Sequence, residues 1–264
     1  MSTKKLLKST INRLGFDLHK LPDKETSILP LKTEGKLGVY KTPLGNFYLP
    51  MDAPEDVVIN CIKEGNIFEP EVVEVAKRFI KEGTAVLDVG ANFGQMSLIF
   101  ADLTGSDGIV YSFEAQKSIF DMLKKNLSIN NIHNVEALFN AVYFESNKTF
   151  HFPEPDFQRF ASYGSYNLPL DAAEGQEVKS LKIDDIKIEK PISFMKVDIQ
   201  GCDLFAMQGA VETIKKHRMP ILFEFEQQFQ DEYQTNFQDY VDFVNSIEYK
   251  FVEVILHNYL IVHK

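Results

Sequence analysis

The sequence has little that would cross-link it or anchor it in a membrane. Its 264 residues include only two cysteines, Cys61 and Cys202, which lie far apart without the spacing of zinc ligands. This scarcity argues against a disulfide framework and fits a reducing compartment. No apolar run approaches the roughly 20 residues that cross a bilayer, and the first residues lack the apolar stretch and cleavage site of a secretory signal. We therefore expect a soluble, cytoplasmic protein.

The sequence also has fewer basic than acidic residues. Lys and Arg number 28 against 38 Asp and Glu, which gives a formal net charge of −10 and an isoelectric point near 5.1. Binding along a nucleic acid requires clustered Lys and Arg that neutralise phosphates, so the composition disfavours nucleic acid as a substrate. With 44% hydrophobic residues, a chain of this length buries one large core and suits a single α/β domain with extensions.

The first 24 residues differ from the rest because basic side chains outnumber acidic ones there. Leu7, Ile11, Leu14 and Leu18 recur at helical spacing, which predicts an amphipathic helix. Two interpretations stay open: an arm that docks on a membrane surface or a partner, and a helix that covers the domain's own core.

Residues 25–80 are expected to pack on the core. Lys32–Pro50 alternates weakly around Gly38 and Gly45, as a small hairpin would. Pro70–Lys81 has the pattern of an amphipathic helix that ends at Gly83.

From residue 81 onward, strand and helix patterns alternate. The predicted strands are Ala85–Val89, Ile109–Phe113, Val135–Val142, Ile192–Val197 and Ile221–Phe225, and the predicted helices are Gln95–Leu103, Lys117–Ile129, Ala206–His217 and Phe237–Ile247. This alternation implies a parallel sheet with helices on both faces. A tight turn at His257–Asn258 joins Phe251–Ile255 to Tyr259–His263, which predicts an antiparallel pair at one edge of a mixed sheet.

The loop after the first of these strands indicates the ligand. Open α/β sheets bind ligands outside the carboxyl ends of their strands, and the loop there reads Asp88-Val89-Gly90-Ala91-Asn92-Phe93-Gly94. Gly90 permits a tight turn and Gly94 permits close helix packing, but Asn92 replaces the middle glycine of the dinucleotide fingerprint. That glycine lets the backbone approach a pyrophosphate, so the loop favours a ligand without phosphates, such as S-adenosylmethionine.

Further candidates for this cofactor site follow the strands in order. Asp88 precedes the turn, where a carboxylate complements the cationic methionine portion. Glu114 ends the second strand, where a carboxylate accepts hydrogen bonds from both ribose hydroxyls. Asn140, near the end of the third strand, offers an amide to the adenine edge, and the backbone neighbours Ala91 and Ala141 complete the predicted site.

These motifs resemble those of the FkbM-type family of class I methyltransferases. The matching stretches are Val86–Gly94, Ser112–Ala115, Ile183–Ile186, Met195–Asp203, Gly209–Ala210 and Pro220–Glu224, within a likeness that runs from about Phe68 to the end. The resemblance implies a Rossmann-like seven-stranded mixed sheet with helices on both faces and the last strand antiparallel, spanning 81–264. It also implies S-adenosylmethionine as donor and, as acceptor, a hydroxyl on a sugar, glycan, polyketide or similar small compound.

Methyl transfer to a hydroxyl requires alignment, exclusion of water and a group that takes the proton. Asp198, at the end of the fourth strand, is the first candidate for this base. Lys196 lies two residues earlier and on the same side of the strand, so the two form either a catalytic pair or a structural ion pair. Gln200 stands where the family often has Glu, and a neutral amide cannot act as a base. We assign Gln200 and Glu224 to the acceptor side.

The stretch from 143 to 179 exceeds the dozen residues that a crossover requires, so we expect a lid-like insertion. Tyr163 and Tyr166 are predicted to stack on the acceptor, with Gly164 as a hinge. Thr149–Phe152 is predicted to form a hairpin with Val142–Phe144. The histidines lack the spacing of a metal site, while a divalent cation at Asp198 is left open. Two other functions also stay open: an oxidoreductase with a nucleotide cofactor, which Asn92 disfavours, and a binding module without turnover, which Gln200 allows.

Overall fold

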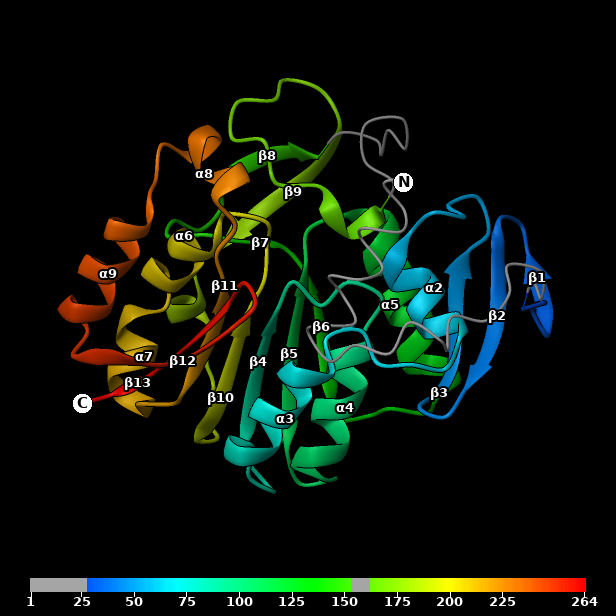
Figure 1. Cartoon of the computed structure of the whole chain (residues 1–264), viewed down its shortest axis with the longest axis horizontal. Helices are drawn as coiled ribbons and strands as arrows, with labels where there is room; N and C mark the ends of the chain where they lie inside the picture. The colour runs from blue at the N-terminus through cyan, green and yellow to red at the C-terminus, as the bar shows by residue number, and fades with distance from the viewer. Residues whose placement is uncertain (1–27, 153–161) are drawn as a thin grey trace, which may run out of the picture.

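The computed structural model describes residues 28–152 and 162–264. The basic arm predicted at 1–24 lies outside the described residues. The described part forms a central sheet with helices on both faces, and a small N-terminal sheet lies at the end of the molecule opposite the C-terminal strands (Figure 1).

The central sheet has seven strands within the described residues, in the order β12-β13-β11-β10-β4-β5-β6. Their bounds are β4 (Ala85–Val89), β5 (Ile109–Glu114), β6 (Val135–Phe139), β10 (Ile192–Val197), β11 (Ile221–Glu224), β12 (Tyr249–Ile255) and β13 (Asn258–His263). Neighbours from β6 to β11 pair in parallel, whereas β13 pairs antiparallel with both β11 and β12. The predicted Rossmann-like mixed sheet is confirmed, and its strand order reverses between β4 and β10.

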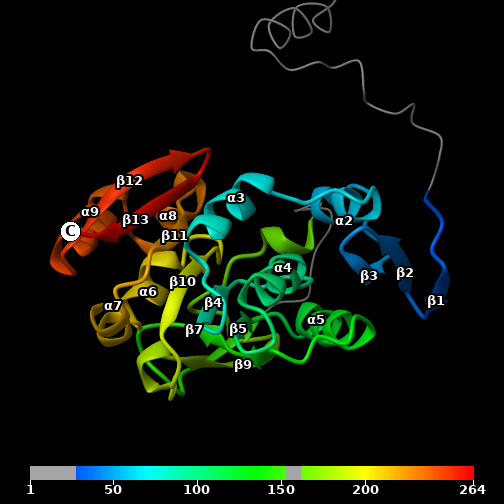
Figure 2. The same cartoon turned by 90° about the horizontal axis from the view of Figure 1, so that it is seen from below.

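Alternate residues of the strands meet different helices because side chains along a strand point to opposite faces. Leu87, Val89 and Val197 share a buried cluster with α6 (Asp203–Gln208), α7 (Val211–His217) and α9 (Phe237–Ser246). Val86 and Phe194 instead share a cluster with α3 (Pro70–Phe79) and α4 (Gln95–Thr104). The two layers stand on either side of the sheet in Figure 2, so both faces of the parallel strands are covered, as such sheets require.

Two elements that the periodicity predicted as continuous are broken. The predicted helix Ala206–His217 divides into α6 and α7 at Gly209, where a Cβ atom would lie 2.2 Å from the backbone oxygen of Tyr143. The predicted strand Val135–Val142 divides at Asn140 into β6 and β7 (Ala141–Val142), and β7 leaves the central sheet. At each break a residue of the insertion lies close by: Tyr143 beside Gly209 and Lys179 beside Asn140. No local sequence pattern predicts these contacts.

The insertion builds its own three-stranded sheet, in the order β7-β9-β8. β9 (Gln176–Leu181) pairs in parallel with β7 and antiparallel with β8 (Thr149–Phe152). The predicted hairpin between Thr149–Phe152 and Val142–Phe144 is therefore wrong, because β9 lies between the two. The short helices η2 (Tyr163–Ser165) and η3 (Ile183–Asp185) precede and follow β9.

The N-terminal part is a three-stranded meander rather than a two-stranded hairpin. It consists of β1 (Lys32–Glu34), β2 (Leu37–Thr42) and β3 (Gly45–Pro50), followed by the unpredicted helix α2 (Val57–Lys63). It is joined to α5 (Lys117–Ile129) by the fully buried Asn126, whose side chain accepts from Tyr48 N at 2.6 Å and donates to Phe93 O at 2.9 Å. The meander thus shares a core with the β4–α4 turn. A second unpredicted helix, α8 (Gln227–Tyr233), follows β11.

Candidate active site

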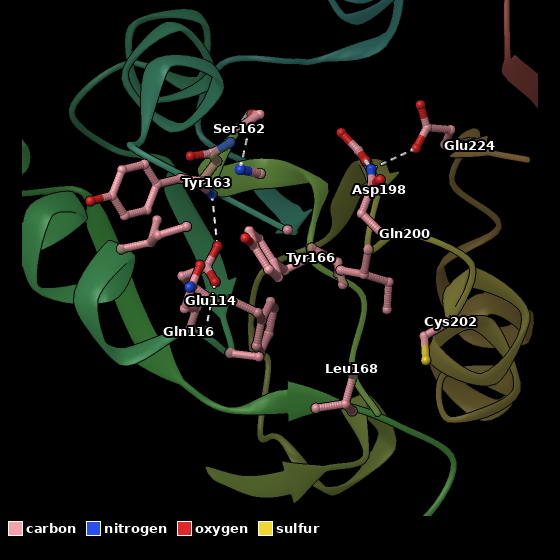
Figure 3. A pocket seen from close by; sticks show the side chains of 18 of the residues that line it. Glu114, Gln116, Ser162, Tyr163, Tyr166, Leu168, Asp198, Gln200, Cys202 and Glu224 are labelled. Carbon is pink, nitrogen blue, oxygen red and sulfur yellow. Dashed lines mark hydrogen bonds between the residues drawn. The ribbon is translucent and has the colours of Figure 1, made fainter. Parts of the chain in front are cut away.

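A cavity of about 380 Å³ opens at the carboxyl ends of the parallel strands (Figure 3). Each of these strands brings residues to it: Gly90 after β4, Glu114 at the end of β5, Asn140 after β6, Asp198 after β10 and Glu224 at the end of β11. The position is the switch point where open α/β sheets bind ligands, and the volume suits a small molecule.

The β4–α4 turn is pressed against both neighbouring strands. Gly90 has φ +85, and a Cβ atom on it would lie 1.8 Å from the backbone oxygen of Asp198. The backbone N–H groups of Gly90 and Ala91 both donate to Phe113 O, at 3.0 and 2.9 Å. Gly94 has φ +90, and a Cβ there would lie 2.6 Å from Leu123 in α5. Both glycines have a positive φ that other residues rarely adopt, and at Gly90 the backbone of Asp198 leaves no room for a side chain.

Glu114 is held in place by the loop that it faces. Its carboxylate accepts hydrogen bonds from Asn92 N at 3.0 Å and Gln116 N at 2.8 Å. Burial raises the pKa of Glu114 to about 7, against the opposing effect of these backbone N–H groups. A carboxylate has lone pairs for about four hydrogen bonds, so Glu114 retains capacity for ligand hydroxyls.

The other predicted cofactor residues fall into two groups. Asn140 and Ala141 line the cavity, and the Asn140 amide also donates to Lys179 O of β9 at 3.0 Å. Asp88 is fully buried within β4, accepts a hydrogen bond from Ser97 Oγ at 2.6 Å, and does not line the cavity. Burial raises the pKa of Asp88, while Lys196 acts against this. Direct contact between Asp88 and a cofactor stays a prediction, and the structure places this carboxylate behind the turn.

Asp198 and Glu224 form a connected acidic centre. Lys196 is 3% exposed, and its Nζ lies 2.9 Å from Asp198 Oδ2. Gln200 Nε2 donates to Asp198 Oδ1 at 3.3 Å and to Glu224 Oε2 at 3.1 Å (Figure 3). The predicted proximity of Lys196 and Asp198 is thus observed as an ion pair. Gln200 joins the two acids with an amide that donates to both.

The two carboxyl groups have opposite protonation preferences. Burial works against the charge on Asp198, but Lys196 overcomes this and lowers the pKa of Asp198. Burial and the neighbouring charge of Asp198 raise the pKa of Glu224 to about 11. Burial also opposes the charge on Lys196, yet Asp198, Asp88 and Glu69 raise the pKa of Lys196. At neutral pH, Asp198 is therefore ionised, Glu224 carries a proton and Lys196 is cationic.

The insertion supplies part of the cavity wall. Tyr163, Gly164, Tyr166 and Leu168 line it, and the Tyr166 ring lies between Glu114 and Gln200 in the view of Figure 3. The Tyr163 hydroxyl donates to Asp52 Oδ1 at 3.1 Å, and its ring packs edge-on against Phe93 at 6.1 Å between centroids. The predicted lid tyrosines are therefore at the cavity, with Tyr163 tied to the segment before α2.

Sequence reasoning missed Glu69, which also lines the cavity. It is the residue before α3 and has φ 55, in the left-handed region, and its Oε1 accepts from Asn258 Nδ2 at 3.3 Å. The segment Phe68-Glu69-Pro70 gave only a helix-start signal, because Glu69 follows no strand of the sheet. Apolar lining residues were missed as well, among them Phe152, Leu168, Cys202 and Phe229.

In the part of the chain that the structure describes, the Asp and Glu side chains of the cavity lining have no basic counterpart there. Among the described residues that line it are five carboxyl groups and no Lys, Arg or His; the acids are Glu69, Glu114, Asp198, Glu224 and Glu226. Between Glu114 and Asn140 the wall is apolar, with Ala115, Ile119 and Ala141. S-adenosylmethionine has a sulfonium, an ammonium and one carboxylate, so it is a net cation with an aromatic base, and this lining fits it. When bound, it supplies a methyl group on positively charged sulfur.

Fold and site together define a methyltransferase that uses S-adenosylmethionine. The family model described as the methyltransferase FkbM domain matches residues 88–251, more than half of the chain. The protein therefore belongs to the FkbM family of S-adenosylmethionine-dependent methyltransferases.

Solved structures of similar fold include methyltransferases of several kinds. Methyltransferase FkbM from Methylobacillus flagellatus KT is 16% identical, with 78% of this chain and 52% of that chain covered and a TM-score of 0.47. An S-adenosylmethionine-dependent O-methyltransferase from Thermotoga maritima is 15% identical, with coverages of 84% and 75% and a TM-score of 0.46. An rRNA methylase from Streptococcus thermophilus is 12% identical, with coverages of 74% and 95% and a TM-score of 0.45.

No curated protein matches the sequence. None of these comparisons tests the acceptor, so the predicted exclusion of nucleic acid is not confirmed. Within residues 28–152 and 162–264, no three His, Cys, Asp or Glu side chains are placed to hold a metal ion. None of the helices described there has the length and apolarity of a membrane span.

Proposed function

We propose that the protein methylates a hydroxyl oxygen of a sugar, glycan or small natural product in the cytoplasm, with residues 81–264 as the catalytic domain. The observation that carries this proposal is the arrangement of one cavity at the switch point. Glu114 faces it from β5, and the group of Asp198, Gln200 and Glu224 faces it from β10 and β11.

In this proposal Asp198 takes the proton of the acceptor hydroxyl. A base must be unprotonated before it acts, and the ion pair with Lys196 favours the ionised form of Asp198. Lys196 acts through Asp198 as a positioning residue. Gln200 fixes the other oxygen of Asp198, and the protonated Glu224 offers a hydrogen-bond donor to the acceptor side.

The walls of the cavity support an uncharged acceptor with a flat face. The rings of Tyr163, Tyr166, Phe152 and Phe229 line it, and aromatic rings pack well against the apolar face of a sugar or a similar ring. The carboxyl groups of the lining repel phosphates, which disfavours a nucleic-acid backbone within the cavity. We assign the described parts of the segment 143–179, residues 143–152 and 162–179, the role of a lid that keeps water out.

The donor part of the proposal is tested by calorimetry with S-adenosylmethionine and with NAD. We expect binding of the first alone. Glu114→Ala should weaken donor binding by about 10- to 100-fold, because it removes charge-assisted hydrogen bonds worth roughly 1.5–3 kcal/mol. Glu136→Ala, on the exposed side of β6, is the matched control and should leave the affinity unchanged. Binding of NAD in preference to S-adenosylmethionine would indicate an oxidoreductase instead.

The acceptor part is tested by detecting S-adenosylhomocysteine over a panel of monosaccharides, oligosaccharides, polyketides and short RNAs. We expect production with a hydroxyl compound that carries no phosphate. Production with RNA alone would contradict the proposed acceptor class. Donor binding without product on any member of the panel would favour a binding module without turnover.

A further inference from the structure

The donor's methionine portion carries an ammonium group that a carboxylate would stabilise, and the sequence suggests Asp88 for this role. Asp88 lines neither the main cavity nor the smaller pocket of about 60 Å³ beside the Gly90 turn. Its carboxylate is fully buried; Oδ2 accepts from Ser97, while Oδ1 has no hydrogen-bond partner among the described residues. A carboxylate that contacts the ammonium group within these pockets is therefore one other than Asp88.

Glu69 lies beside the Gly90 turn although it follows no strand of the central sheet. It lines both the main cavity and the smaller pocket, together with Gly90, Asn92 and Asp198. The smaller pocket is also lined by Gln95 and Met96, the first residues of α4, and by Lys196, which is paired with Asp198. Gly90 and Asn92 line both pockets, and Asn92 N also donates to Glu114, so the same turn connects the proposed ribose site with the pocket that Glu69 lines.

The segment that carries Glu69 is fixed to the first turn of α4. The Gln95 side chain accepts from Phe68 N at 2.8 Å and donates to Asn66 O at 2.9 Å. The Glu69 carboxylate itself accepts a hydrogen bond from the side chain of Asn258. Asn258 is 3% exposed and lies opposite Glu224 in the pairing of β11 with β13. The carboxylate is thus positioned relative to the cofactor turn and the acidic centre together.

The backbone of Glu69 also favours a functional role. A left-handed conformation strains a non-glycine residue by about 1–2 kcal/mol, and Glu69 adopts it with φ 55 and ψ 61 directly before Pro70. Glu69 occupies the N-cap position of α3, yet its side chain makes no capping hydrogen bond. The carboxylate thus lies at the cavity and makes no bond to the helix N-terminus, and strained residues of this kind cluster at functional sites.

From this geometry we propose that Glu69 binds the ammonium group of S-adenosylmethionine. The inference rests on the proposed donor site at Gly90 and Glu114, and it assigns a binding residue to the part of the chain that precedes the matched family domain. Burial and then the charge of Asp198 raise the pKa of Glu69 to about 7, with Lys196 acting in the opposite direction. A bound cation favours the ionised form of this carboxyl.

The test uses two ligands that share adenosine and a neutral thioether and differ in the amino-acid portion. S-adenosylhomocysteine has that portion, and 5′-methylthioadenosine lacks it. Glu69→Gln keeps the shape of the side chain and should weaken S-adenosylhomocysteine binding about tenfold or more, as expected for loss of a charge-assisted hydrogen bond. Binding of 5′-methylthioadenosine should change by less than about twofold. Calorimetry measures both.

Two variants control the experiment. Glu74→Gln changes an exposed glutamate of α3 and should leave both affinities unchanged. Glu69→Asp retains the charge and should retain more S-adenosylhomocysteine affinity than Glu69→Gln, and it covers the case in which the amide variant folds poorly. Unchanged S-adenosylhomocysteine binding in Glu69→Gln, or equal weakening of both ligands, overturns the role of Glu69. If Glu114→Ala leaves both ligands unaffected, the proposed donor site fails instead.

Discussion

At the scale of single residues, the site depends on which carboxyl groups carry charge. Asp198 and Glu224 are joined by one amide, yet the pKa of Asp198 is lowered by Lys196 and that of Glu224 is raised by burial to about 11. Pairs of acids whose environments separate their pKa values commonly divide the acid and base roles of a reaction. Gln200, which stands where the family often has Glu, donates its amide to both acids.

Asp198→Asn tests the base. The substitution keeps the size of the side chain and removes its ability to take a proton, so the rate should fall by about 10²- to 10⁴-fold. The rate is measured as S-adenosylhomocysteine release, at saturating donor, with the acceptor identified from the panel. Donor affinity by calorimetry should stay within a few-fold of the wild-type value. Near-normal turnover would show that another group accepts the proton.

The residue scale also shows what spacing can and cannot predict. Gly90, Glu114, Asp198 and Glu224 were chosen because each follows or ends a predicted parallel strand, and the structure brings all four to one cavity. Asp88 lies within such a strand, and its side chain turns into the core beside Ser97. Glu69 could not be predicted, because it reaches the cavity through a strained turn that the sequence does not encode as a motif.

At the scale of elements, the β4–α4 turn is packed against the residue that follows β10. Gly90→Ala should destabilise the protein by about 3 kcal/mol or more, since it combines the strain of a positive φ with a clash against the backbone of Asp198. Gly83→Ala is a matched control: Gly83 has φ +77, but nothing lies within 4 Å of a Cβ there. It should cost only about 1 kcal/mol. Denaturant unfolding measures both, and equal losses would exclude the backbone contact as the cause.

The elements were predicted well where their pattern is local. The predicted bounds agree with the observed ones for the strands Ala85–Val89 and Ile192–Val197 and for the helix Lys117–Ile129. The breaks at Gly209 and Asn140 and the position of β9 between β7 and β8 were missed. These depend on which distant segment passes nearby, and hydrophobic periodicity carries no information about that.

At the scale of the whole molecule, buried acids link stability to pH. Burial raises the pKa values of Glu69, Glu114 and Asp203 to about 7, and that of Glu224 further. In the unfolded chain these groups titrate near pH 4 to 4.5. Between those two ranges the folded state binds more protons than the unfolded state, so the free energy of unfolding falls as pH rises.

We therefore expect the donor-free protein to be more stable near pH 5.5 than near pH 8. The free energy of unfolding should be smaller at pH 8 by several kcal/mol, since one pKa unit corresponds to roughly 1.4 kcal/mol. The melting temperature should therefore be lower at pH 8 by about 5 °C or more. Thermal unfolding at a series of pH values measures it. Saturating S-adenosylmethionine should reduce the loss, because a cation stabilises ionised carboxylates. A melting temperature that rises from pH 5.5 to 8 would contradict the assigned burial of these acids.

The sequence by itself determined the alternation of strands and helices, the glycine-rich turn at Gly90 and the membership of a methyltransferase family. These features are encoded in periodicity and short spacings, which the backbone follows locally. Only the tertiary structure decided that Asp88 lies behind the turn and that Glu69 lies beside Asn258, 189 residues further along the chain. Side-chain direction and long-range packing decide which carboxylates face a ligand. A local sequence pattern predicts neither of them.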